Sequence, residues 1–354
     1  MEETISVRKG EEIDIKYLFS YLKEYIHDLD STAPLSVKQF SGGYSNLTYL
    51  LTSGDIELVL RRPPVGANIK SAHDMGREYR ILKSLRPVYP YCPEALVYCE
   101  DQSIIGTNFY VMRRIPGIIL RKELPKELRF SPEEARKLCE KLLDVHVDLH
   151  SIDVKSSGLD FIGKPEGYVA RQVDGWSERY RKAKTDDAPD FETVMSWLKD
   201  KQPQDTDTPV IIHNDYKFDN VVLDPQNPMN IIGVLDWEMA TYGDPLMDLG
   251  NSLAYWVEKN DPPEFENIRV MPTTMDGAMT RIELVERYGE KTGRNMSFFD
   301  YYLCFGLFRL AVIAQQIYKR YYQGLTSDKR FGMLIFAVHI LERAALQIID
   351  TTTI

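Results

Sequence analysis

The sequence predicts an α+β protein of two lobes, the first an antiparallel sheet with one helix and the second larger and mainly helical. Three observations support this fold class. The 354 residues exceed the usual size of one compact core. Short apolar runs separated by turn residues occupy 37–62, and helical patterns dominate beyond residue 118. We expect the lobes to cover residues 1–113 and 114–354.

The expected sheet begins after a glycine pair in the stretch SGGYSN, at residues 41–46. Two strands, Leu47 to Leu51 and Ile56 to Arg61, flank a Ser-Gly-Asp turn that is typical of a hairpin. The stretch TNFYVMRRIPG, at 107–117, predicts a further strand that ends at a Pro-Gly pair. The sequence therefore predicts at least three strands in the first lobe.

One amphipathic helix is expected within this lobe. Apolar residues from Ala72 to Leu85 recur at helical spacing, with Ser71 as the N-cap and Pro87 closing the segment. In the second lobe, Ser131 begins a helix with Pro132 at its first position and Glu134 completing a capping box. Further helices are expected near 166–183 and 190–201 and, after a small strand region at 210–237, up to the C-terminus.

Composition limits the classes of partner. The net charge is −10, which disfavours a broad nucleic-acid or anionic-membrane surface. The four cysteines show neither zinc-ligand spacing nor a disulfide framework, and the acidic start does not resemble a signal peptide, so we expect a cytoplasmic protein. The apolar stretch 301–322 is interrupted by Arg309, Gln315 and Gln316, which favours a buried core helix over a membrane span.

A polar loop between two buried strands is the first candidate for catalysis. Val210 to Ile212 and Val221 to Leu223 are short apolar runs, and between them stands HNDYKFDN, at 213–220. A third apolar run, Ile231 to Leu235, ends at Asp236 and is joined to the second by a short turn. If these two strands pair as a hairpin, Asp236 comes near Asp215 and Asn220.

Two carboxylates and an amide oxygen suit a hard cation. Mg²⁺ takes oxygen ligands and keeps substrate phosphates in its remaining positions. Asn220 and Asp236 can hold the ion, while Asp215 can accept a proton from an attacking hydroxyl. The set predicts phosphoryl transfer.

HNDYKFDN resembles the H-x-D-x-x-x-x-N catalytic loop of the protein-kinase-like superfamily, and LDWE stands where that superfamily places its D-F-G aspartate. Together, HNDYKFDN and VLDWEMATYGDPLMDLG look like the aminoglycoside phosphotransferase family, which includes choline kinase-like enzymes. The similarity is strongest to the kinase-like domain that some proteins join to an acyl-CoA dehydrogenase. The resemblance covers nearly the whole chain and implies a bilobal protein-kinase-like fold.

The resemblance assigns a role to each matching residue. Asp215 is the implied base, His213 braces the loop, Lys217 contacts the transferred phosphate, and Asn220 and Asp236 hold Mg²⁺. ATP is the implied nucleotide, with GTP not excluded. The residues implied to bind the nucleotide are Ser41, Gly42, Gly43, Ser45 and Asn46 over its phosphates, Arg61 with its helix partner Glu78, and Met112, Arg113 and Ile115 beside the adenine.

Two positions depart from the family pattern. Arg61 stands where a lysine is usual; arginine keeps the charge but has a planar, forked head. Asn214 stands where many phosphotransferases have glycine, and asparagine is among the few other residues that tolerate positive φ.

Several of these residues also have plainer interpretations. A glycine pair before a strand is often only a turn, Glu78 and Lys217 could be solvated charges, and His213 could be a hydrogen-bonded core histidine. Asp244 and Asp248 are best interpreted as a helix cap and a structural anchor beneath the loop.

The expected acceptor is a small hydroxylated molecule. Only seven residues separate Asp236 from Asp244, too few for the segment on which protein kinases seat a polypeptide. An aminoglycoside, a choline-like cation and a hydroxylated acyl thioester all remain open. We expect the acceptor site at 166–180 and 298–323, where Arg171 and Arg179 could meet an anionic group.

Two rival functions remain. A nucleotide-binding pseudokinase with a regulatory role is suggested by Arg61, and a metal-dependent hydrolase could be built on Asp215, Asp236 and Asp244.

Overall fold

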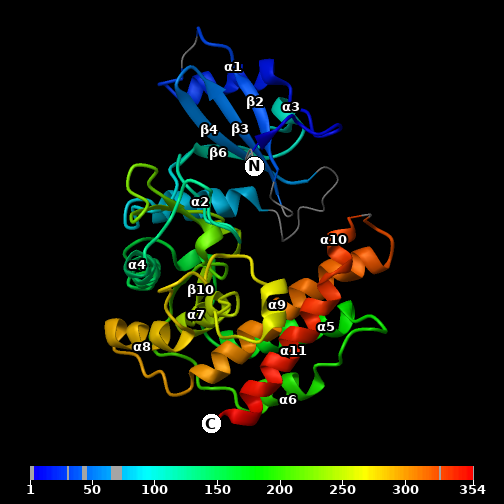
Figure 1. The fold of residues 1–354 in the computed structure, drawn as a ribbon. Coiled ribbons are helices and arrows are strands. Elements are labelled where there is room, and N and C mark those ends of the chain that lie inside the picture. The colour runs from blue at the N-terminus through cyan, green and yellow to red at the C-terminus, as the bar shows by residue number, and fades with distance from the viewer. Residues whose placement is uncertain (1–3, 30–31, 42–45, 65–73, 327, 354) are drawn as a thin grey trace. The chain divides into compact units, whose positions relative to one another are not determined.

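The computed structural model describes residues 4–29, 32–41, 46–64, 74–326 and 328–353. By their contacts the residues group into two compact units. The sheet unit comprises Met1–Gly117 with Ser157–Leu159 and Ile232–Glu238, and the helical unit comprises Ile118–Ser156, Asp160–Ile231 and Met239–Ile354. In Figure 1 most of the sheet unit is blue to cyan, and the helical unit runs from green to red. The predicted class, an antiparallel sheet followed by a mainly helical part, is confirmed.

The sheet unit contains one antiparallel sheet of six strands in the order β1-β2-β3-β4-β6-β5. Both predicted hairpin strands are present, and Ser53 pairs with Ile56 across their turn. The elements of this unit are β1 (Thr4–Ile5), α1 (Ile15–Tyr25), β2 (Ser36–Phe40), β3 (Leu47–Ser53), β4 (Ile56–Arg62), α2 (Met75–Leu85), β5 (Ala95–Cys99), α3 (Gln102–Ile105) and β6 (Phe109–Arg113).

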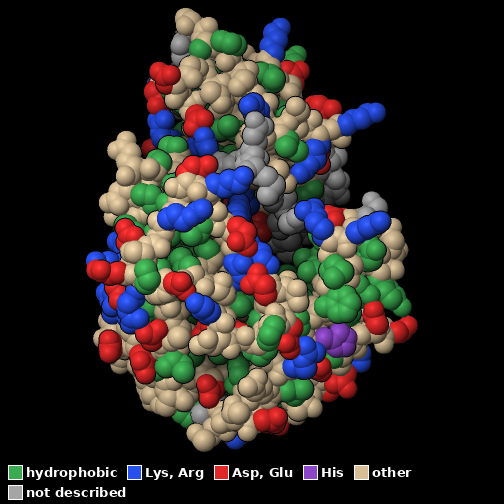
Figure 2. Space-filling model, viewed as in Figure 1, with side chains coloured by type: hydrophobic (Ala, Val, Ile, Leu, Met, Phe, Trp, Pro, Cys, Tyr) green, Lys and Arg blue, Asp and Glu red, His purple; other side chains and the backbone are tan. Residues whose placement is uncertain are grey.

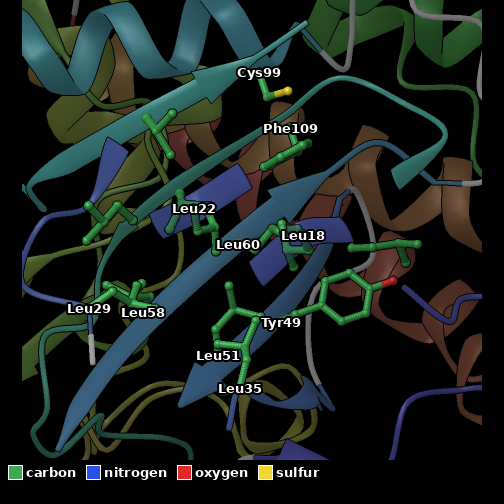
Figure 3. Close-up of a cluster of buried hydrophobic side chains, with 14 residues drawn as sticks. Leu18, Leu22, Leu29, Leu35, Tyr49, Leu51, Leu58, Leu60, Cys99 and Phe109 are labelled. Atoms are coloured by element: carbon green, nitrogen blue, oxygen red, sulfur yellow. The ribbon is translucent and has the colours of Figure 1, made fainter. Parts of the chain in front are cut away.

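The core of the sheet unit lies between α1 and one face of the sheet. Leu18 and Leu22 of α1 are fully buried against Tyr49 of β3 and Leu60 of β4, as Figure 3 shows. Alternate residues of a strand face the same side, so burial of this set fixes which face of β3 and β4 turns inward. The opposite face is then left for the side chains that contact α2.

The start of α2 corrects the sequence prediction. The N-cap is Asp74, whose carboxylate accepts a hydrogen bond from Arg77 N–H, and the helix begins at Met75. The predicted cap, Ser71, and the predicted first apolar residue, Ala72, lie outside the described residues. Aspartate and serine are both strong N-caps, and the structure uses Asp74, three residues after the predicted cap.

The helical unit is built around the long helix α9, which packs against α5, α7 and α11. The predicted capping box is present: Ser131 Oγ accepts from Glu134 N–H, and Glu134 accepts from Ser131 N–H. The helices are α4 (Pro132–His150), α5 (Tyr168–Ala183), α6 (Glu192–Asp200), α7 (Pro245–Leu253), α8 (Arg281–Thr292), α9 (Phe299–Tyr322), α10 (Lys329–Gly332) and α11 (Leu334–Thr351), with short 3-10 turns η1 (Asp160–Ile162), η2 (Phe218–Asn220), η3 (Trp237–Met239) and η4 (Pro263–Asn267).

Two short antiparallel pairs hold the loop that the sequence singles out. β7 (Val210–Ile212) pairs with β10 (Thr241–Gly243), and β8 (Val221–Leu223) pairs with β9 (Ile231–Val234). The predicted hairpin of the second and third apolar runs is therefore confirmed. The loop itself, between β7 and β8, contains η2.

The apolar stretch 301–322 forms α9, and most of its large side chains are buried, which confirms the prediction of a core helix. A different segment, Lys329–Thr351, is long and apolar enough to cross a membrane by length and composition, and 22% of its most apolar window is buried. Met333 and Phe336 of this segment are exposed, and Figure 2 shows hydrophobic side chains at the surface on the side of α10 and α11.

Candidate active site

The catalytic-loop sequence is held from below by one buried carboxylate. Asp248, on α7, is fully buried; its Oδ2 accepts from His213 N–H at 2.8 Å and its Oδ1 from Asn214 N–H at 2.6 Å. These two bonds fix the chain just before Asp215. Asn214 has φ +64°, so the asparagine does adopt the left-handed conformation that glycine would take. The interpretation of Asp248 as an anchor is confirmed.

Two histidines on α4 complete the anchor. His146 Nε2 lies 2.9 Å and His150 Nε2 3.1 Å from Asp248 Oδ2, and both rings are buried. The hydrogen bonds from these rings hold the pKa of Asp248 well below its usual range, against the effect of burial. Burial and the neighbouring His146 lower the pKa of His150 to about 4. His150 is therefore neutral at pH 7 and donates to a charged aspartate.

Asp215 is held by one of its two carboxylate oxygens. Its Oδ2 accepts hydrogen bonds from Lys217 Nζ and from Asn220 Nδ2, the latter at 2.8 Å. Its Oδ1 has no hydrogen-bond partner among the described residues, and the side chain is 23% exposed. One oxygen is thus fixed and the other is available to a substrate.

Lys217 is buried beside this aspartate. Its Nζ also lies 3.5 Å from Asp219 Oδ1 and 5.1 Å from the ring centroid of Tyr255. Burial lowers the pKa of Lys217, but the charge of Asp215 outweighs burial and the net shift is upward. Lys217 therefore remains a cation within the loop, and its burial contradicts its interpretation as an exposed charge.

The sheet unit brings three carboxylates around Arg61 of β4. Nη1 lies 3.2 Å from Glu78 Oε1 and 3.2 Å from Asp236 Oδ1, and Nη2 lies 3.1 Å from Glu238 Oε2. The pair of Arg61 with Glu78, implied by the resemblance, is therefore present. Burial lowers the pKa of Arg61, but these carboxylates, Glu78 foremost, raise it well above its usual value.

Three carboxylates on one guanidinium leave an excess of negative charge. Glu78 is buried and accepts from Tyr110 O–H at 2.7 Å, while its Oε2 has no hydrogen-bond partner. Asp236 Oδ2 has no partner among the described residues, and the side chain is 39% exposed. Asp236 also has φ +67°, unusual for a residue other than glycine. This strained residue directs a carboxylate with spare binding capacity toward solvent.

The predicted phosphate-covering loop is described only at its ends. Asn46 is buried and its Nδ2 donates to Glu238 Oε2 at 2.9 Å, while Ser41 is exposed. Gly42, Gly43 and Ser45 lie outside the described residues.

The predicted adenine-contacting segment begins at the end of β6. Arg113 N–H donates to Glu94 O and Arg114 N–H donates to Glu57 O, so both groups are already bonded. Ile115 follows outside the strand, with no hydrogen bond from its backbone to any described residue. Met112 pairs with Val59 in the sheet. Ile115 is therefore the residue here with free backbone groups.

Three residues of the site were not predicted. Glu238 binds both Arg61 and Asn46, and His146 and His150 support Asp248. Glu238 follows Asp236 by two positions in LDWE, which was a usable signal. The two histidines are four apart on a predicted helix, so they share a face, but nothing in the sequence paired them with Asp248.

Asp244 caps α7: its Oδ1 accepts from Leu246 N–H and Met247 N–H. The cap interpretation is confirmed. Of the two arginines expected to meet an anion, Arg171 donates to the carbonyls of Lys164 and Glu166. Arg179 lies over the ring of Trp176.

Comparisons with known proteins agree with this geometry. The phosphotransferase enzyme family matches residues 36–281. Acyl-CoA dehydrogenase family member 11 of Rattus norvegicus is 33% identical over 352 residues, which cover 98% of this chain and 44% of that protein. The chain thus spans less than half the length of this relative.

Solved structures show the same fold. A candidate aminoglycoside phosphotransferase of Ralstonia eutropha has 28% identity and a TM-score of 0.81, covering 97% of this chain and 100% of that one. The aminoglycoside phosphotransferase APH(4)-Ia, solved with ADP and hygromycin B, has 14% identity and a TM-score of 0.59, covering 94% and 98%. The resemblance stated from the motifs is confirmed, and the chain belongs to the phosphotransferase enzyme family.

Proposed function

We propose that this chain transfers the γ-phosphoryl group of ATP to a hydroxyl group of a small molecule, with Asp215 as the base. The observation that carries the proposal is the state of the Asp215 carboxylate. Lys217 and Asn220 hold its Oδ2, and its Oδ1 is left free to accept the proton of a substrate hydroxyl. Membership of the phosphotransferase family supports the class of reaction.

Asn220 and Asp236 are the proposed ligands of Mg²⁺. Asn220 uses its Nδ2 to hold Asp215, which leaves its Oδ1 without a partner among the described residues. Asp236 belongs to the carboxylate cluster around Arg61, where negative charge is in excess. Both are hard oxygen donors of the kind that Mg²⁺ prefers. The ion would supply neutralisation of the charge on the nucleotide phosphates.

Arg61 is proposed to take the place of the usual lysine. It forms the ion pair with Glu78, and its forked head suits phosphate oxygens as well as carboxylates. Lys217 would stabilise the charge of the group in transfer. Ile115 would offer its backbone to the adenine, and the segment 41–46 would cover the phosphates.

A small acceptor agrees with the tight chain after Asp236. Strand β10 begins at Thr241 and α7 begins at Pro245, so no long segment follows on which a polypeptide could lie. Relatives of this fold include a structure with hygromycin B, and the rat relative is named for a dehydrogenase of acyl-CoA. A hydroxylated metabolite is therefore proposed, in the cytoplasm and without nucleic acid or membrane.

The geometry favours this function over a hydrolase. A hydrolase would need Asp244 as a third metal ligand, but Asp244 is buried and caps α7. A pseudokinase would bind ATP without transfer, and only an assay of turnover separates it from the proposed enzyme.

The test is transfer of label from γ-³²P-ATP with Mg²⁺ to a panel of hydroxylated metabolites. The wild type should label at least one, and Asp215→Asn should lower kcat about a hundredfold to ten-thousandfold. Asp224→Asn, on the adjacent hairpin, is the matched control and should keep full activity. Binding of ATP, followed by thermal shift, should persist in both variants. Transfer by Asp215→Asn within about tenfold of the wild type would remove the base assignment.

A further inference from the structure

Arg309, in the middle of α9, is a buried charge without a carboxylate partner among the described residues. The residue is 4% exposed, yet it forms no hydrogen bond or ion pair with any described residue. Because burying a lone charge is costly, buried guanidinium groups are normally paired. The nitrogen atoms of Arg309 are not among the fully buried polar atoms that lack a partner. They therefore retain some contact with solvent.

The other buried basic side chains show how unusual this is. Arg61 and Lys217 each bind carboxylates, Arg269 binds Glu123 and Glu266, and Arg62 donates to a carbonyl and a tyrosine hydroxyl. Among the basic residues that are buried in the described parts of the chain, Arg309 is the exception. A ligand with negative charge is the missing kind of partner.

The surroundings of Arg309 include Trp176 and two tyrosines of the helical unit. Its guanidinium lies 5.1 Å from the ring centroid of Trp176 on α5. Its charge acts on the hydroxyl groups of Tyr168 and Tyr255, where burial raises the pKa and Arg309 opposes the rise. Both tyrosines therefore lie within electrostatic range of this arginine.

These two tyrosines contact the residues on either side of the proposed base. Tyr168 O–H donates to Asn214 Oδ1 at 3.3 Å, and the ring of Tyr255 lies 5.1 Å from Lys217 Nζ. Asn214 precedes Asp215, and Lys217 donates to it. Tyr168 and Tyr255 therefore link the surroundings of Arg309 to the catalytic loop.

A second arginine strengthens the positive character of this place. Arg179 is exposed and lies 4.7 Å from the ring centroid of the same Trp176. Both guanidinium groups therefore lie within cation–π distance of one indole ring. Unlike Arg171, Arg179 is not engaged with backbone carbonyls in the described structure.

We propose that Arg309 binds an oxyanion carried by the acceptor, so that the substrate is a hydroxylated molecule with a carboxylate or phosphate group. The arginine fork fits both kinds of oxyanion. This inference rests on the proposed function for the identity of the reaction but predicts binding by itself. The proposal excludes acceptors that carry only positive charge, such as choline or a polyamine.

The experiment measures binding by isothermal titration calorimetry, without nucleotide, of probes matched in pairs. One arm compares hydroxy acids of three to six carbons with the corresponding amides. The other compares phosphate monoesters of short diols with the parent diols. At least one anionic member should bind the wild type about tenfold or more tightly than its neutral counterpart, as expected for a charge-assisted pair. The arm in which the anionic probe binds more tightly shows whether the site takes a carboxylate or a phosphate.

Substitutions of Arg309 test whether this residue causes the preference for the anionic probe. Arg309→Met should remove it, and Arg309→Lys should retain part of it because the charge remains without the fork. Arg320→Met, an exposed position on the same helix, is the matched control for loss of one charge and should keep the preference. Circular dichroism of each variant reports whether the fold persists.

Two outcomes overturn the proposal: a wild type that shows no preference for the anionic member of any pair, or a preference that Arg309→Met retains. The first outcome requires no variant, so it applies even if Arg309→Met fails to fold. Phosphoryl transfer from ATP is measured separately. An anion preference without transfer would remove the proposed function and leave the binding site. Transfer to neutral acceptors alone would leave the proposed function and remove the binding site.

Discussion

Arg61 joins more of the site than any other residue of the sheet unit. It contacts Glu78 from α2 and both Asp236 and Glu238 from the segment after β9. Its side chain is 10% exposed, so its charge is only weakly screened by solvent. Loss of this arginine would leave the buried carboxylate of Glu78 without its ion pair, close to two further carboxylates.

Arg61→Met should therefore destabilise the fold by about 3 kcal/mol, the cost of leaving a buried charge without its partner. The measurement is the free energy of unfolding in urea. Arg113→Met is the control, since Arg113 pairs with Asp28 and Glu94 at the surface and its loss should cost less than about 1 kcal/mol. Equal effects of the two substitutions would show that the cluster around Arg61 is not a buried ionic centre.

Single residues differ in how far the sequence could predict them. The pair of Arg61 and Glu78 was predictable, because a strand and a helix with opposite charges matched a known pattern. Arg309 was visible only as an interruption of an apolar helix, and a charge at such a place has no sequence partner to identify its role. Its lack of a partner becomes evident only when the surrounding helices are in place.

At the scale of elements, α4 supports the catalytic loop through a hydrogen-bonded group that titrates. His150 has a pKa of about 4 in the fold, against 6.5 for an unperturbed histidine, because it is buried next to His146. Between these two values the unfolded chain binds a proton at His150 and the folded chain does not. Stability from this group is therefore complete above pH 6.5 and is lost as the pH falls toward 4.

This difference predicts a loss of about 3 kcal/mol from His150 over that range. The measurement is the free energy of unfolding at several pH values between 4 and 7.5. His150→Gln should be less stable at pH 7 but should lose less stability on acidification than the wild type. Parallel pH profiles of the two proteins would show that His150 is not the group responsible.

The crossing of α7 and α9 depends on two glycines. A Cβ atom at Gly306 would lie 2.3 Å from Gly250 O and 2.7 Å from Gly250 C, and backbone atoms cannot move away independently. The close approach fixes α7, which carries the anchor Asp248, against the core helix.

Gly306→Ala should therefore destabilise the protein by about 1–3 kcal/mol, as expected for overpacking. Gly175→Ala on α5 is the control, since its Cβ would meet only Arg179 Nη1, at 3.7 Å. Removal of a helical glycine there should stabilise by up to about 1 kcal/mol. The measurement is thermal unfolding of both variants. A Gly306→Ala variant with unchanged stability would mean that α7 and α9 can separate without a cost in free energy.

Elements with local signals were predictable and the others were not. The capping box at Ser131, the hairpin of β3 and β4 and the hairpin of β8 and β9 all depend on residues close in sequence. Strand β6 pairs with β4 as well as with β5, the strand that precedes it, so its place inside the sheet depends on tertiary contacts. No single-sequence pattern specifies such a pairing.

At the scale of the whole chain, the sheet unit carries Arg61 and Asp236 and the helical unit carries Asp215 and Asn220. The sequence predicted all four residues: Asp215, Asn220 and Asp236 match motifs of the family, and Arg61 stands where the family usually has lysine. The identity of the acceptor was not predictable from those motifs, because the helices α5 and α9, which carry Trp176 and Arg309 of the proposed oxyanion site, lie outside them. The proposed activity depends on one divalent ion bound by Asn220 and Asp236.

Electron paramagnetic resonance of Mn²⁺ in the presence of AMP-PNP tests that claim most directly, because it measures occupancy of the metal site without any acceptor. Asn220→Ala and Asp236→Asn should each weaken Mn²⁺ binding about tenfold or more, since each removes a ligand of the ion. Asp261→Asn, which serves as the control, should bind as the wild type does. Unchanged Mn²⁺ binding in either single variant would contradict a shared ion and with it the proposed function.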